Sequence, residues 1–289
     1  MRATDAPAKI NLALHVTGQR ADGYHLIESF VVFTELGDRV MADLSSADGF
    51  HLEGPESAAL SRDADGSNLV VRARDALREA ARQSGRDAPP VSIRLDKRVP
   101  VASGIGGGSA DAAATLKALS QLWDYRPTDE ILSGIALDLG ADVPMCLNGT
   151  PLIARGIGEV LQPVELGFAL DLVLVNPRIG VSTPEVFSRL GRRHNPPLPA
   201  PKGMTDRDQF IDWLAKTRND LEAPARNLVA DISQCLSLLE ESGARLARMS
   251  GSGATCFGLY ACRDAAAEAA ARLKHGRPDW FIAATCTVA

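Results

Sequence analysis

The chain has 289 residues, which allows one large domain or two of ordinary size with an ample apolar core. With 45% hydrophobic and 23% charged residues it has the composition of a globular protein, which excludes a disordered chain. The formal net charge of −5 disfavours an extended nucleic-acid surface, and no apolar run approaches the roughly 20 residues that a bilayer requires, so we expect no nucleic acid and no membrane as partner.

The first residues of the chain lack the apolar core and cleavage site of a signal peptide, which predicts a cytoplasmic protein. The five cysteines form no CxxC pair, so we expect buried free thiols in a reducing compartment and no zinc site. For assembly, the sequence leaves a monomer or a homodimer open.

A strand is predicted over residues 7–16, where polar and apolar residues alternate after a proline. This alternation places Lys9 and Asn11 on the same face. Two interpretations remain open for the pair. It is either the solvated face of an ordinary strand or a set of polar groups directed into a functional site.

A turn at Asp22-Gly23 is predicted next, and Tyr24 and His25 follow it. An exposed aromatic ring beside a histidine can stack on a nucleobase and hydrogen-bond its edge, although a tyrosine packed at the base of a loop is equally ordinary. Alternating residues over 30–44 then indicate sheet, and residues 47–54 are predicted to form a hairpin.

A helix is predicted from residue 69 to Gly85, with cap character at Ser67-Asn68 and apolar residues at helical spacing. After a pair of prolines, residues 91–100 have the pattern of a strand that leads directly into a glycine-rich loop. Strand, glycine loop and helix in this order are the setting that a phosphate-binding loop requires.

The glycine-rich loop is the main functional signal of the sequence. Four glycines fall within residues 104–108, and strong helix formers follow from Ser109 onward. Unpaired amides and the positive end of the helix dipole meet at such a point, so it can bind an anion. A tight turn with glycines for packing alone is the alternative, but four glycines favour phosphate binding.

This loop differs from the familiar phosphate loops. The Walker pattern requires a lysine and then Ser or Thr after the last glycine, but Ser109 and Ala110 follow it here, and Ser109 also replaces the third glycine of the dinucleotide fingerprint. No VAIK, HRD or DFG sequence of a protein kinase occurs. Asp111, in the first helical turn, is expected to point away from a phosphate. The candidates for positive charge at the loop are a bound Mg2+, Lys9, Lys97 and Arg98.

A third helix is predicted to begin at Pro127-Thr128-Asp129-Glu130, and a mainly apolar passage continues to residue 149. Asp142 interrupts this passage between apolar neighbours. A carboxylate in apolar surroundings needs a partner or a task. Helix capping and a functional role both remain open for it.

The C-terminal half alternates strand and helix patterns, with small residues at 251–254 that form a second glycine loop between strand-like segments. Alone, this loop is also compatible with a plain β-turn. The other elements expected there are a hairpin at 151–161, a strand at 170–177, a helix from 181 that includes Phe187, a proline-rich loop at 191–208, and helices at 228–243 and 263–276.

Three stretches together resemble the motifs of one superfamily. PAKINLAL at 7–14, PVASGIGGGSADAA at 100–113 and MSGSGATCFGLY at 249–260 are similar to the three motifs of the galactokinase, homoserine kinase, mevalonate kinase and phosphomevalonate kinase (GHMP) superfamily. Within it, RADGYH at 20–25 and LGADVPMCLNG at 139–149 resemble the branch that phosphorylates a cytidine diphosphate ester of methylerythritol.

The resemblance implies an α+β protein with the two-domain GHMP kinase fold. It implies an N-terminal ATP-binding α/β domain over 1–158 and a C-terminal α+β ferredoxin-like domain over 159–289, with the active site in the cleft between them. It also implies that ATP, with Mg2+, donates its γ-phosphoryl group to the 2-hydroxyl of that small-molecule substrate, in the non-mevalonate route to isoprenoid precursors.

Site residues follow from the same resemblance, position by position. Asp142 would be the catalytic carboxylate, with Lys9 as its partner. The substrate-binding residues would be Asn11 at the methylerythritol part, Tyr24, His25 and Phe187 at the cytosine, and Thr183. The ATP-binding residues would be Asn68 and Lys97 near adenine, with Pro100, Val101, Ala102, Ser103, Gly104, Ile105, Gly106, Gly107, Gly108, Ser109 and Ala110 around the triphosphate. The metal ligands are unknown, because glycines at 107 and 108 replace the serines usual in the superfamily.

Two other functions remain open on the sequence. Another alcohol kinase of the superfamily, or its decarboxylase relative, would have no use for Tyr24 and His25. A non-catalytic nucleotide-binding protein on the same fold could lose Lys9 or Asp142 freely, and both are present.

Overall fold

The computed structural model describes residues 2–60, 68–101, 103–201 and 206–288, which form two compact units. Unit 1 consists of Met1–Ala8, Leu36–Val101 and Gly106–Gly149, and unit 2 of Lys9–Glu35, Ala102–Ile105 and Thr150–Ala289. Strands β1 (Arg2–Gln19) and β2 (His25–Leu44) run through both units. A single domain boundary between residues 158 and 159 therefore stays a prediction.

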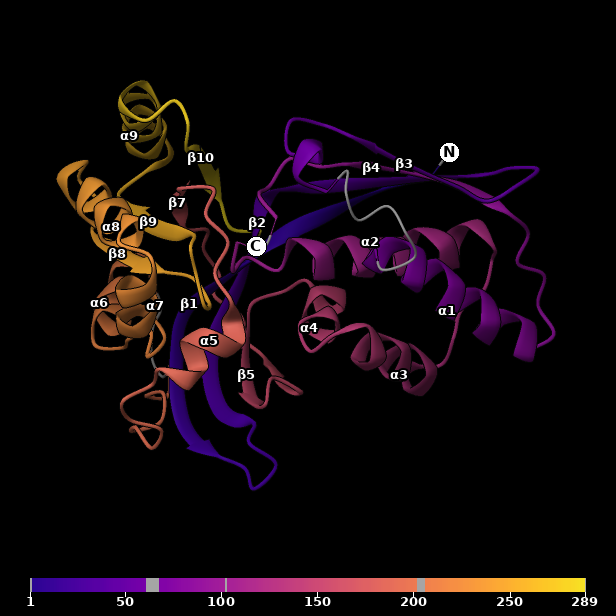
Figure 1. Cartoon of the computed structure of the whole chain (residues 1–289), viewed down its shortest axis with the longest axis horizontal. Helices are drawn as coiled ribbons and strands as arrows, with labels where there is room; N and C mark the ends of the chain where they lie inside the picture. The colour runs from indigo at the N-terminus through magenta and orange to yellow at the C-terminus, as the bar shows by residue number, and fades with distance from the viewer. Residues whose placement is uncertain (1, 61–67, 102, 202–205, 289) are drawn as a thin grey trace. The chain divides into compact units, whose positions relative to one another are not determined.

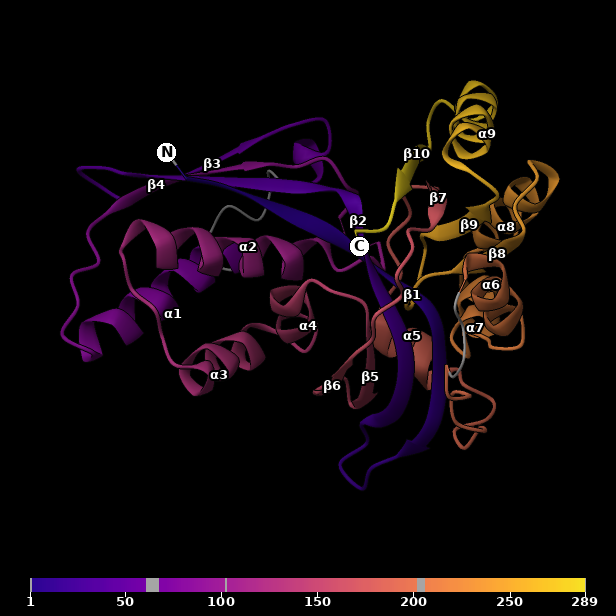
Figure 2. The same cartoon turned by 180° about the vertical axis from the view of Figure 1, so that it is seen from behind.

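Unit 1 is a sheet with helices against one face (Figures 1 and 2). The second half of β2 pairs antiparallel with β4 (Val91–Asp96), and β3 (Gly49–Glu53) pairs parallel with β4. Helices α1 (Leu69–Gln83) and α2 (Gly107–Leu122) pack side by side beneath this sheet. The remaining elements of the unit are a short 3-10 helix (Ser57–Ala59), α3 (Asp129–Leu139) and α4 (Val143–Asn148).

Two predicted helix starts in unit 1 are confirmed by their cap hydrogen bonds. The side-chain oxygen of Asn68 accepts from the Val70 amide at 2.9 Å, and the Thr128 hydroxyl accepts from the Ile131 amide at 3.3 Å. Each bond satisfies an amide that has no carbonyl partner within its own helix, so α1 and α3 begin where the sequence indicated.

Residues 47–54 do not form the hairpin expected from the sequence. Strand β3 instead pairs parallel with β4, and α1 connects the two strands. The carboxylate of Asp48 joins the two strands and the helix, because it accepts from the Arg78 guanidinium at 2.6 and 2.7 Å and from the Val91 amide at 2.9 Å. These partners lie too far along the chain for local turn chemistry to reveal them.

Unit 2 contains two antiparallel arrangements. The first half of β2 pairs with β5 (Leu152–Gly156), which forms the predicted hairpin with β6 (Val160–Pro163). Strands β7 (Asp171–Asn176), β8 (Leu246–Met249), β9 (Cys256–Tyr260) and β10 (Phe281–Cys286) form a separate antiparallel sheet in the order β10-β7-β9-β8. This is the strand order of a ferredoxin-like sheet, as the sequence predicted.

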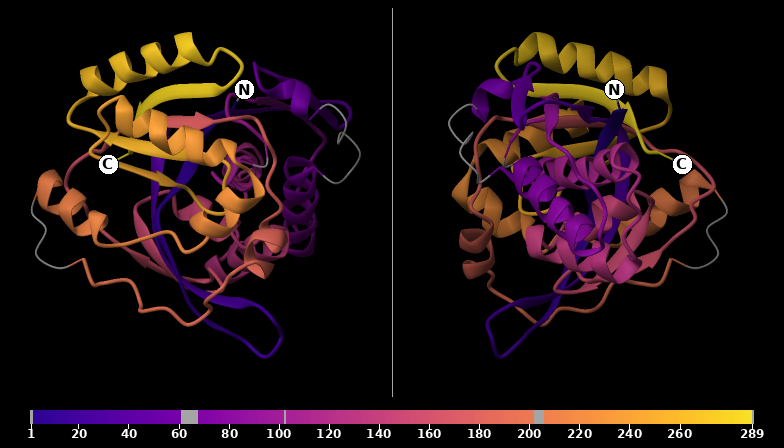
Figure 3. Two further views of the ribbon diagram at one scale, coloured as in Figure 1. Left: turned by 60° about the vertical axis from the view of Figure 1, so that its left-hand side comes forward. Right: turned by 90° about the vertical axis from the view of Figure 1, so that its right-hand side faces the viewer.

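Helices α8 (Asp231–Glu241) and α9 (Arg263–Gly276) cover one face of this sheet, and α9 lies alongside β10 (Figures 2 and 3). Their apolar residues, including Leu239 and Leu273, form one core cluster with Val173 and Val175 of β7. The helix predicted at 263–276 is confirmed in full. The helix predicted at 228–243 is α8, which is shorter at both ends, and Leu228 is instead the last residue of α7 (Glu222–Leu228).

Two features of unit 2 were not predicted. Helix α6 (Arg207–Ala215) follows the proline-rich loop, and Asp206 caps it by accepting from the Gln209 amide at 2.9 Å. An acidic residue three positions before a glutamine is the spacing of a capping box, so this signal was present in the sequence. Cys262 is exposed, whereas the other four cysteines are buried as expected. Within the described ranges, no helix combines the length and apolar character needed to cross a bilayer.

Candidate functional site

The glycine-rich loop ends at the N-terminus of α2. Gly106 precedes the helix with φ 66° and ψ 21°, a left-handed conformation that favours glycine. The Ala110 amide donates to the Gly106 carbonyl at 2.8 Å, so the amides of residues 107–109 have no carbonyl partner within their own helix. These amides and the positive end of the helix dipole have the geometry that a phosphate cradle requires.

The first half of the loop belongs to unit 2 and is held by two other motifs. Gly104 has φ 75°, and a Cβ atom there would lie 2.7 Å from the carbonyl oxygens of Ser250 and Gly253. The Ser250 hydroxyl donates to the Gly104 carbonyl at 3.1 Å, and the Lys9 amide donates to the Ile105 carbonyl at 2.9 Å. The second glycine loop is therefore a support for the first, not an isolated β-turn.

Lys9 and Asn11 are buried on β1, with 5% and 4% of their surfaces exposed. The Lys9 ammonium donates to the Asn11 side-chain oxygen at 3.0 Å. The backbone N–H of Asn11 donates to the Ser250 hydroxyl, also at 3.0 Å. The interpretation of this pair as the solvated face of a strand is wrong, because Lys9 and Asn11 are buried, like Ile10 and Leu12 on the other face.

Asp142 stands at the N-cap position of α4 and is half-buried. Its carboxylate makes no cap hydrogen bond to the first turn, so capping does not account for the residue. The side chains of Val143 and Met145, which follow it, are buried at 0% and 2% exposure. The catalytic role of Asp142 stays a prediction.

Lys97 lies in a buried ion-pair cluster of unit 1. Its ammonium donates to Asp38 and, at 3.0 Å, to Asp111, and only 1% of the residue is exposed. Asp38 also accepts from the backbone amides of Arg98 and Val99 where β4 leads into the glycine loop. The charge of Lys97 is thus balanced inside the unit, so Lys97 is not a spare cation for a triphosphate. Its predicted position near adenine stays a prediction.

The same cluster explains the direction of Asp111, which faces Lys97. Burial raises the pKa of Asp111 to about 8, although the neighbouring ammonium acts in the opposite direction. Burial lowers the pKa of Lys97, but Asp111 and Asp38 outweigh it and raise that pKa on balance. A methyl group on Gly107 would lie 3.0 Å from the Lys97 ammonium, so the cluster is directly beneath the start of α2.

We expect Lys97→Met to lower the free energy of unfolding by about 3–5 kcal/mol near neutral pH, because two carboxylates would stay buried without their cation. The loss should be smaller at pH 5 than at pH 8, because burial raises the pKa of Asp111 to about 8 and its carboxyl is uncharged in acid. Urea unfolding at pH 5 and pH 8 measures both effects. An equal loss at the two pH values would contradict this account, and Arg98→Met, at an exposed neighbour, is the control.

In the wild type, the Asp111 carboxyl by itself makes the stability of the protein depend on pH. Because the folded-state pKa of Asp111 is raised, the folded chain retains a proton that the unfolded chain releases above about pH 4. The contribution of Asp111 to stability is therefore greatest in acid and is lost as the pH rises towards about 8.

A second group of predicted residues meets at the hairpin between β1 and β2. The turn at Asp22 and Gly23 is present, with Tyr24 62% exposed after it. The His25 ring stacks on Phe187 of α5 (Thr183–Ser188), with ring centroids 4.8 Å apart and an interplanar angle of 24°. The structure thus brings together two residues that the sequence related only by resemblance.

The His25 ring has an unsatisfied polar atom. Its Nε2 is buried and has no hydrogen-bond partner among the described residues. Burial, and then the charge of Arg193, lowers the pKa of His25, which keeps the ring neutral at pH 7. A buried nitrogen without a partner indicates a place where a ligand can supply one. Thr183 begins the same helix, and its hydroxyl lies 2.7 Å from that of Ser252.

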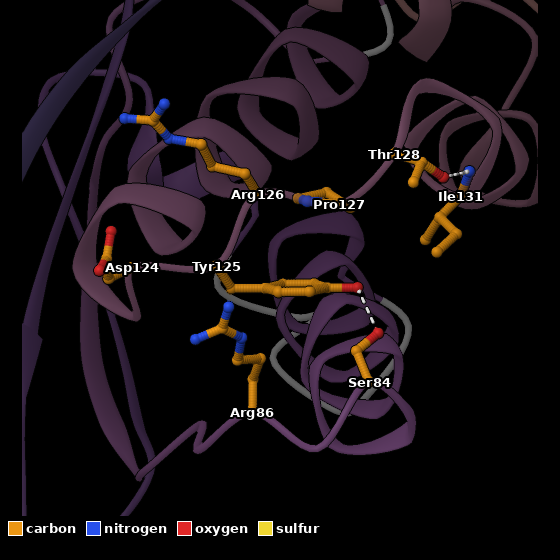
Figure 4. Close-up of a pocket in the computed structure, with 8 residues that line it drawn as sticks. All are labelled: Ser84, Arg86, Asp124, Tyr125, Arg126, Pro127, Thr128 and Ile131. Atoms are coloured by element: carbon orange, nitrogen blue, oxygen red, sulfur yellow. Dashed lines mark hydrogen bonds between the residues drawn. The ribbon is translucent and has the colours of Figure 1, made fainter.

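A cavity of about 430 Å³ lies elsewhere in unit 1, over the connection between α2 and α3 (Figure 4). Tyr125 lines it, and its hydroxyl lies 3.1 Å from that of Ser84. None of the residues predicted to bind ATP or substrate lines this cavity, so it is separate from the candidate site.

Several contributors to the site were missed from the sequence. Ser29, Ser250 and Asp38 each hold a predicted site residue or the glycine loop through a hydrogen bond to a distant segment. Ser250 lies within the motif at 249–260, but Ser29 and Asp38 have no local signal. Of the predicted residues, Ala102 lies outside the described ranges.

Two family models match the chain, GHMP kinases N terminal domain over residues 68–150 and GHMP kinases C terminal over residues 204–277. They cover more than half of it, and the chain belongs to the GHMP kinase family. This confirms the superfamily and the α+β fold that the three motifs predicted.

Within this family, the similar curated proteins are named 4-diphosphocytidyl-2-C-methyl-D-erythritol kinase. The chain is 53% identical to the one from Agrobacterium fabrum and 54% identical to the one from Mesorhizobium japonicum, in each case over 98% of this chain and 95% of the relative. A crystal structure of 4-(cytidine 5'-diphospho)-2C-methyl-D-erythritol kinase is 33% identical, covers 99% of both chains and has a TM-score of 0.82. Homoserine kinase from Cytophaga hutchinsonii, at 18% identity and a TM-score of 0.70 over 99% of this chain and 94% of that one, shares the fold.

Proposed function

We propose that the chain transfers the γ-phosphoryl group of ATP to the 2-hydroxyl of 4-diphosphocytidyl-2-C-methyl-D-erythritol, giving the 2-phosphate and ADP. This step belongs to the non-mevalonate (methylerythritol phosphate) route to isoprenoid precursors. The observation that carries the proposal is the identity of 53% over nearly the whole chain to relatives of that name. The exposed amides at the start of α2 and the buried Lys9–Asn11 pair support it.

ATP is the phosphoryl donor of GHMP kinases. The side chains of this chain that could bind a metal fit an Mg2+ ion that binds together with ATP. Among the described residues, no three His, Cys, Asp or Glu side chains gather to hold an ion. Mg2+ in phosphoryl transfer keeps several waters and is bound largely by phosphate oxygens, so it does not require such a group. When bound, Mg2+ neutralises the charge that develops on the phosphates.

Phosphoryl transfer depends mainly on positioning and on charge neutralisation. In this proposal, Asp142 accepts the proton of the 2-hydroxyl, Lys9 offsets the negative charge of the reacting groups, and Asn11 contacts the methylerythritol part. The amides of the glycine loop hold the β- and γ-phosphates. A cytoplasmic location and a monomeric or homodimeric state stay predictions from the sequence.

The cytosine is assigned to Tyr24, His25 and Phe187, with Thr183 on the same helix as Phe187. Support comes from the stacked His25–Phe187 pair and from the buried His25 nitrogen without a partner. Rings of this kind bind a base by its face, and the imidazole nitrogen can bond its edge.

We expect His25→Phe to raise KM for the cytidine substrate by about 10–100-fold and to leave kcat nearly unchanged. The phenyl ring keeps the stacking on Phe187 but removes the nitrogen that recognises the base. The ratio of kcat/KM for the cytidine ester to that for a uridine ester measures this directly, and it should fall towards one. A preserved ratio would show that the base is read elsewhere, and Tyr24→Phe, which keeps the ring, is the matched control.

A coupled ADP-release assay with a panel of alcohols tests the proposed function. Turnover should be greatest with the cytidine diphosphate ester and negligible with mevalonate and homoserine. Turnover with one of the latter alone would indicate another GHMP kinase. Binding of ATP without ADP release from any alcohol would indicate a non-catalytic nucleotide-binding protein.

A further inference from the structure

The hydroxyl group of Ser29 lies at the end of a hydrogen-bond chain that begins at Lys9. Ser29 is on β2, fully buried, and pairs with Ala154 of β5. The Lys9 ammonium donates to the Asn11 side-chain oxygen at 3.0 Å, and the Asn11 side-chain nitrogen donates to the Ser29 hydroxyl at 2.7 Å. The Ser29 hydroxyl in turn donates to the Ala13 carbonyl at 2.7 Å.

The chemistry of these groups fixes the direction of the chain. An ammonium group has only protons to donate, so the amide atom that faces Lys9 has to be the Asn11 oxygen. The amide nitrogen then faces Ser29, whose oxygen accepts while its single proton goes to the Ala13 carbonyl. Rotating the amide by half a turn would set two donors, the ammonium and the NH2 group, against each other. The Ser29 hydroxyl therefore supports one of the two amide orientations.

The backbone of Asn11 connects this chain to the glycine loop. Its amide donates to the Ser250 hydroxyl at 3.0 Å, and that hydroxyl donates to the Gly104 carbonyl at 3.1 Å. One residue thus holds the Lys9 ammonium with its side chain and the support of the loop with its backbone. A change in the orientation of the Asn11 side-chain amide therefore alters the position of the Lys9 ammonium relative to the glycine loop at Gly104.

We propose that Ser29 is a positioning residue for phosphoryl transfer, which holds the Asn11 amide in the orientation that places the Lys9 ammonium. This inference rests on the proposed function, in which Lys9 and Asn11 act on the reacting groups. Without the hydroxyl, the Asn11 side-chain nitrogen loses the acceptor that it bonds at 2.7 Å, and the Ala13 carbonyl loses the hydroxyl that donates to it. The amide is then free to turn, and Lys9 loses a fixed acceptor. Small misplacements of this kind reduce catalysis strongly.

A double-mutant cycle in the ADP-release assay separates positioning from a structural role. We expect Ser29→Ala to lower kcat by about tenfold or more, with KM for ATP within about twofold of the wild type. In the Asn11→Ala background the same change should lower kcat by no more than about twofold, because Ser29 acts through Asn11. An equal factor in both backgrounds would overturn the proposal.

Two further variants separate the loss of the hydrogen bond from the loss of volume. Ser29→Cys keeps a side chain of similar shape but bonds weakly, so it should lose kcat as Ser29→Ala does. Ser29→Thr retains the hydroxyl and should recover most of the activity. The matched control is Ser242→Ala in the same unit, which removes a hydroxyl bonded to the Leu239 carbonyl at 2.8 Å and should leave kcat unchanged.

An NMR measurement tests the inference without turnover. The Asn11 side-chain NH2 signal, identified by its loss in Asn11→Ala, should exchange slowly in the wild type and in Ser29→Thr. It should exchange at least about tenfold faster in Ser29→Ala or Ser29→Cys, because the buried bond that protects it is gone. Unchanged protection in folded Ser29→Ala would overturn the inference. A wild type that shows this protection but no turnover would instead refute the proposed function.

Discussion

Asp142→Asn should lower kcat by about 10²–10⁴-fold, the usual contribution of a general base, with a much smaller effect on ATP binding. Asparagine has nearly the same shape as aspartate but cannot accept the proton of the 2-hydroxyl at neutral pH. Because the Asp142 carboxylate makes no cap hydrogen bond to α4, the change should leave the start of that helix in place. Steady-state ADP release and ATP titration measure the two effects separately.

The matched control for this prediction is Asp138→Asn, four positions earlier in the same stretch. Asp138 is exposed on α3, so neutralising it should leave kcat within about twofold. If Asp142→Asn retained near-wild-type turnover, another group would have to accept the proton. If both variants lost activity equally, the effect would be one of net charge and not of a base.

Gly104→Ala should abolish ATP binding at concentrations that saturate the wild type, and should lower the free energy of unfolding by about 2 kcal/mol or more. The new methyl group would lie 2.7 Å from two carbonyl oxygens, those of Ser250 and Gly253, and φ at this position is 75°. Backbone atoms cannot move aside as a flexible side chain can, so the loop has to leave the position in which its amides meet the phosphates. ATP titration and urea unfolding check the two parts.

Gly134→Ala is the control for the glycine loop. Gly134 lies within α3, and a Cβ atom there would meet nothing within 4 Å. Alanine at this exposed helical position should leave ATP affinity unchanged and raise stability by up to about 1 kcal/mol. ATP affinity within twofold of the wild type in Gly104→Ala would refute the role of the loop as the phosphate cradle.

Some local sequence signals predicted their elements correctly because the relevant contacts are themselves local. Asn68 and Thr128 cap helices that begin at the next residue, and the helix at 263–276 has its full predicted extent. Other signals failed where the partner was distant. Residues 47–54 pair with β4 and not with each other. The start of α6, in contrast, has a local signal in the spacing of Asp206 and Gln209 at the end of the proline-rich loop.

In the candidate site, too, residues within local motifs were predicted and their distant partners were not. The glycine loop, Lys9, Asn11 and Asp142 were all identified from motifs, and the family they indicated is confirmed. The surroundings of these residues were not predicted. Lys97 was expected to be available to a nucleotide, but it pairs with Asp38 and Asp111 inside unit 1. Ser29 carried no signal at all, because a serine on a strand has no distinctive pattern.

By itself, the sequence determined that a glycine-rich loop leads into a helix, where the capped helices begin, and to which family the chain belongs. These properties depend on neighbouring residues or on short motifs. Only the tertiary structure decided that both faces of β1 are buried, that His25 stacks on Phe187, and that the Asn11 backbone bonds to Ser250, 239 positions away. Burial and hydrogen-bond partners of this kind are set by segments that meet only after folding, and no local pattern contains them.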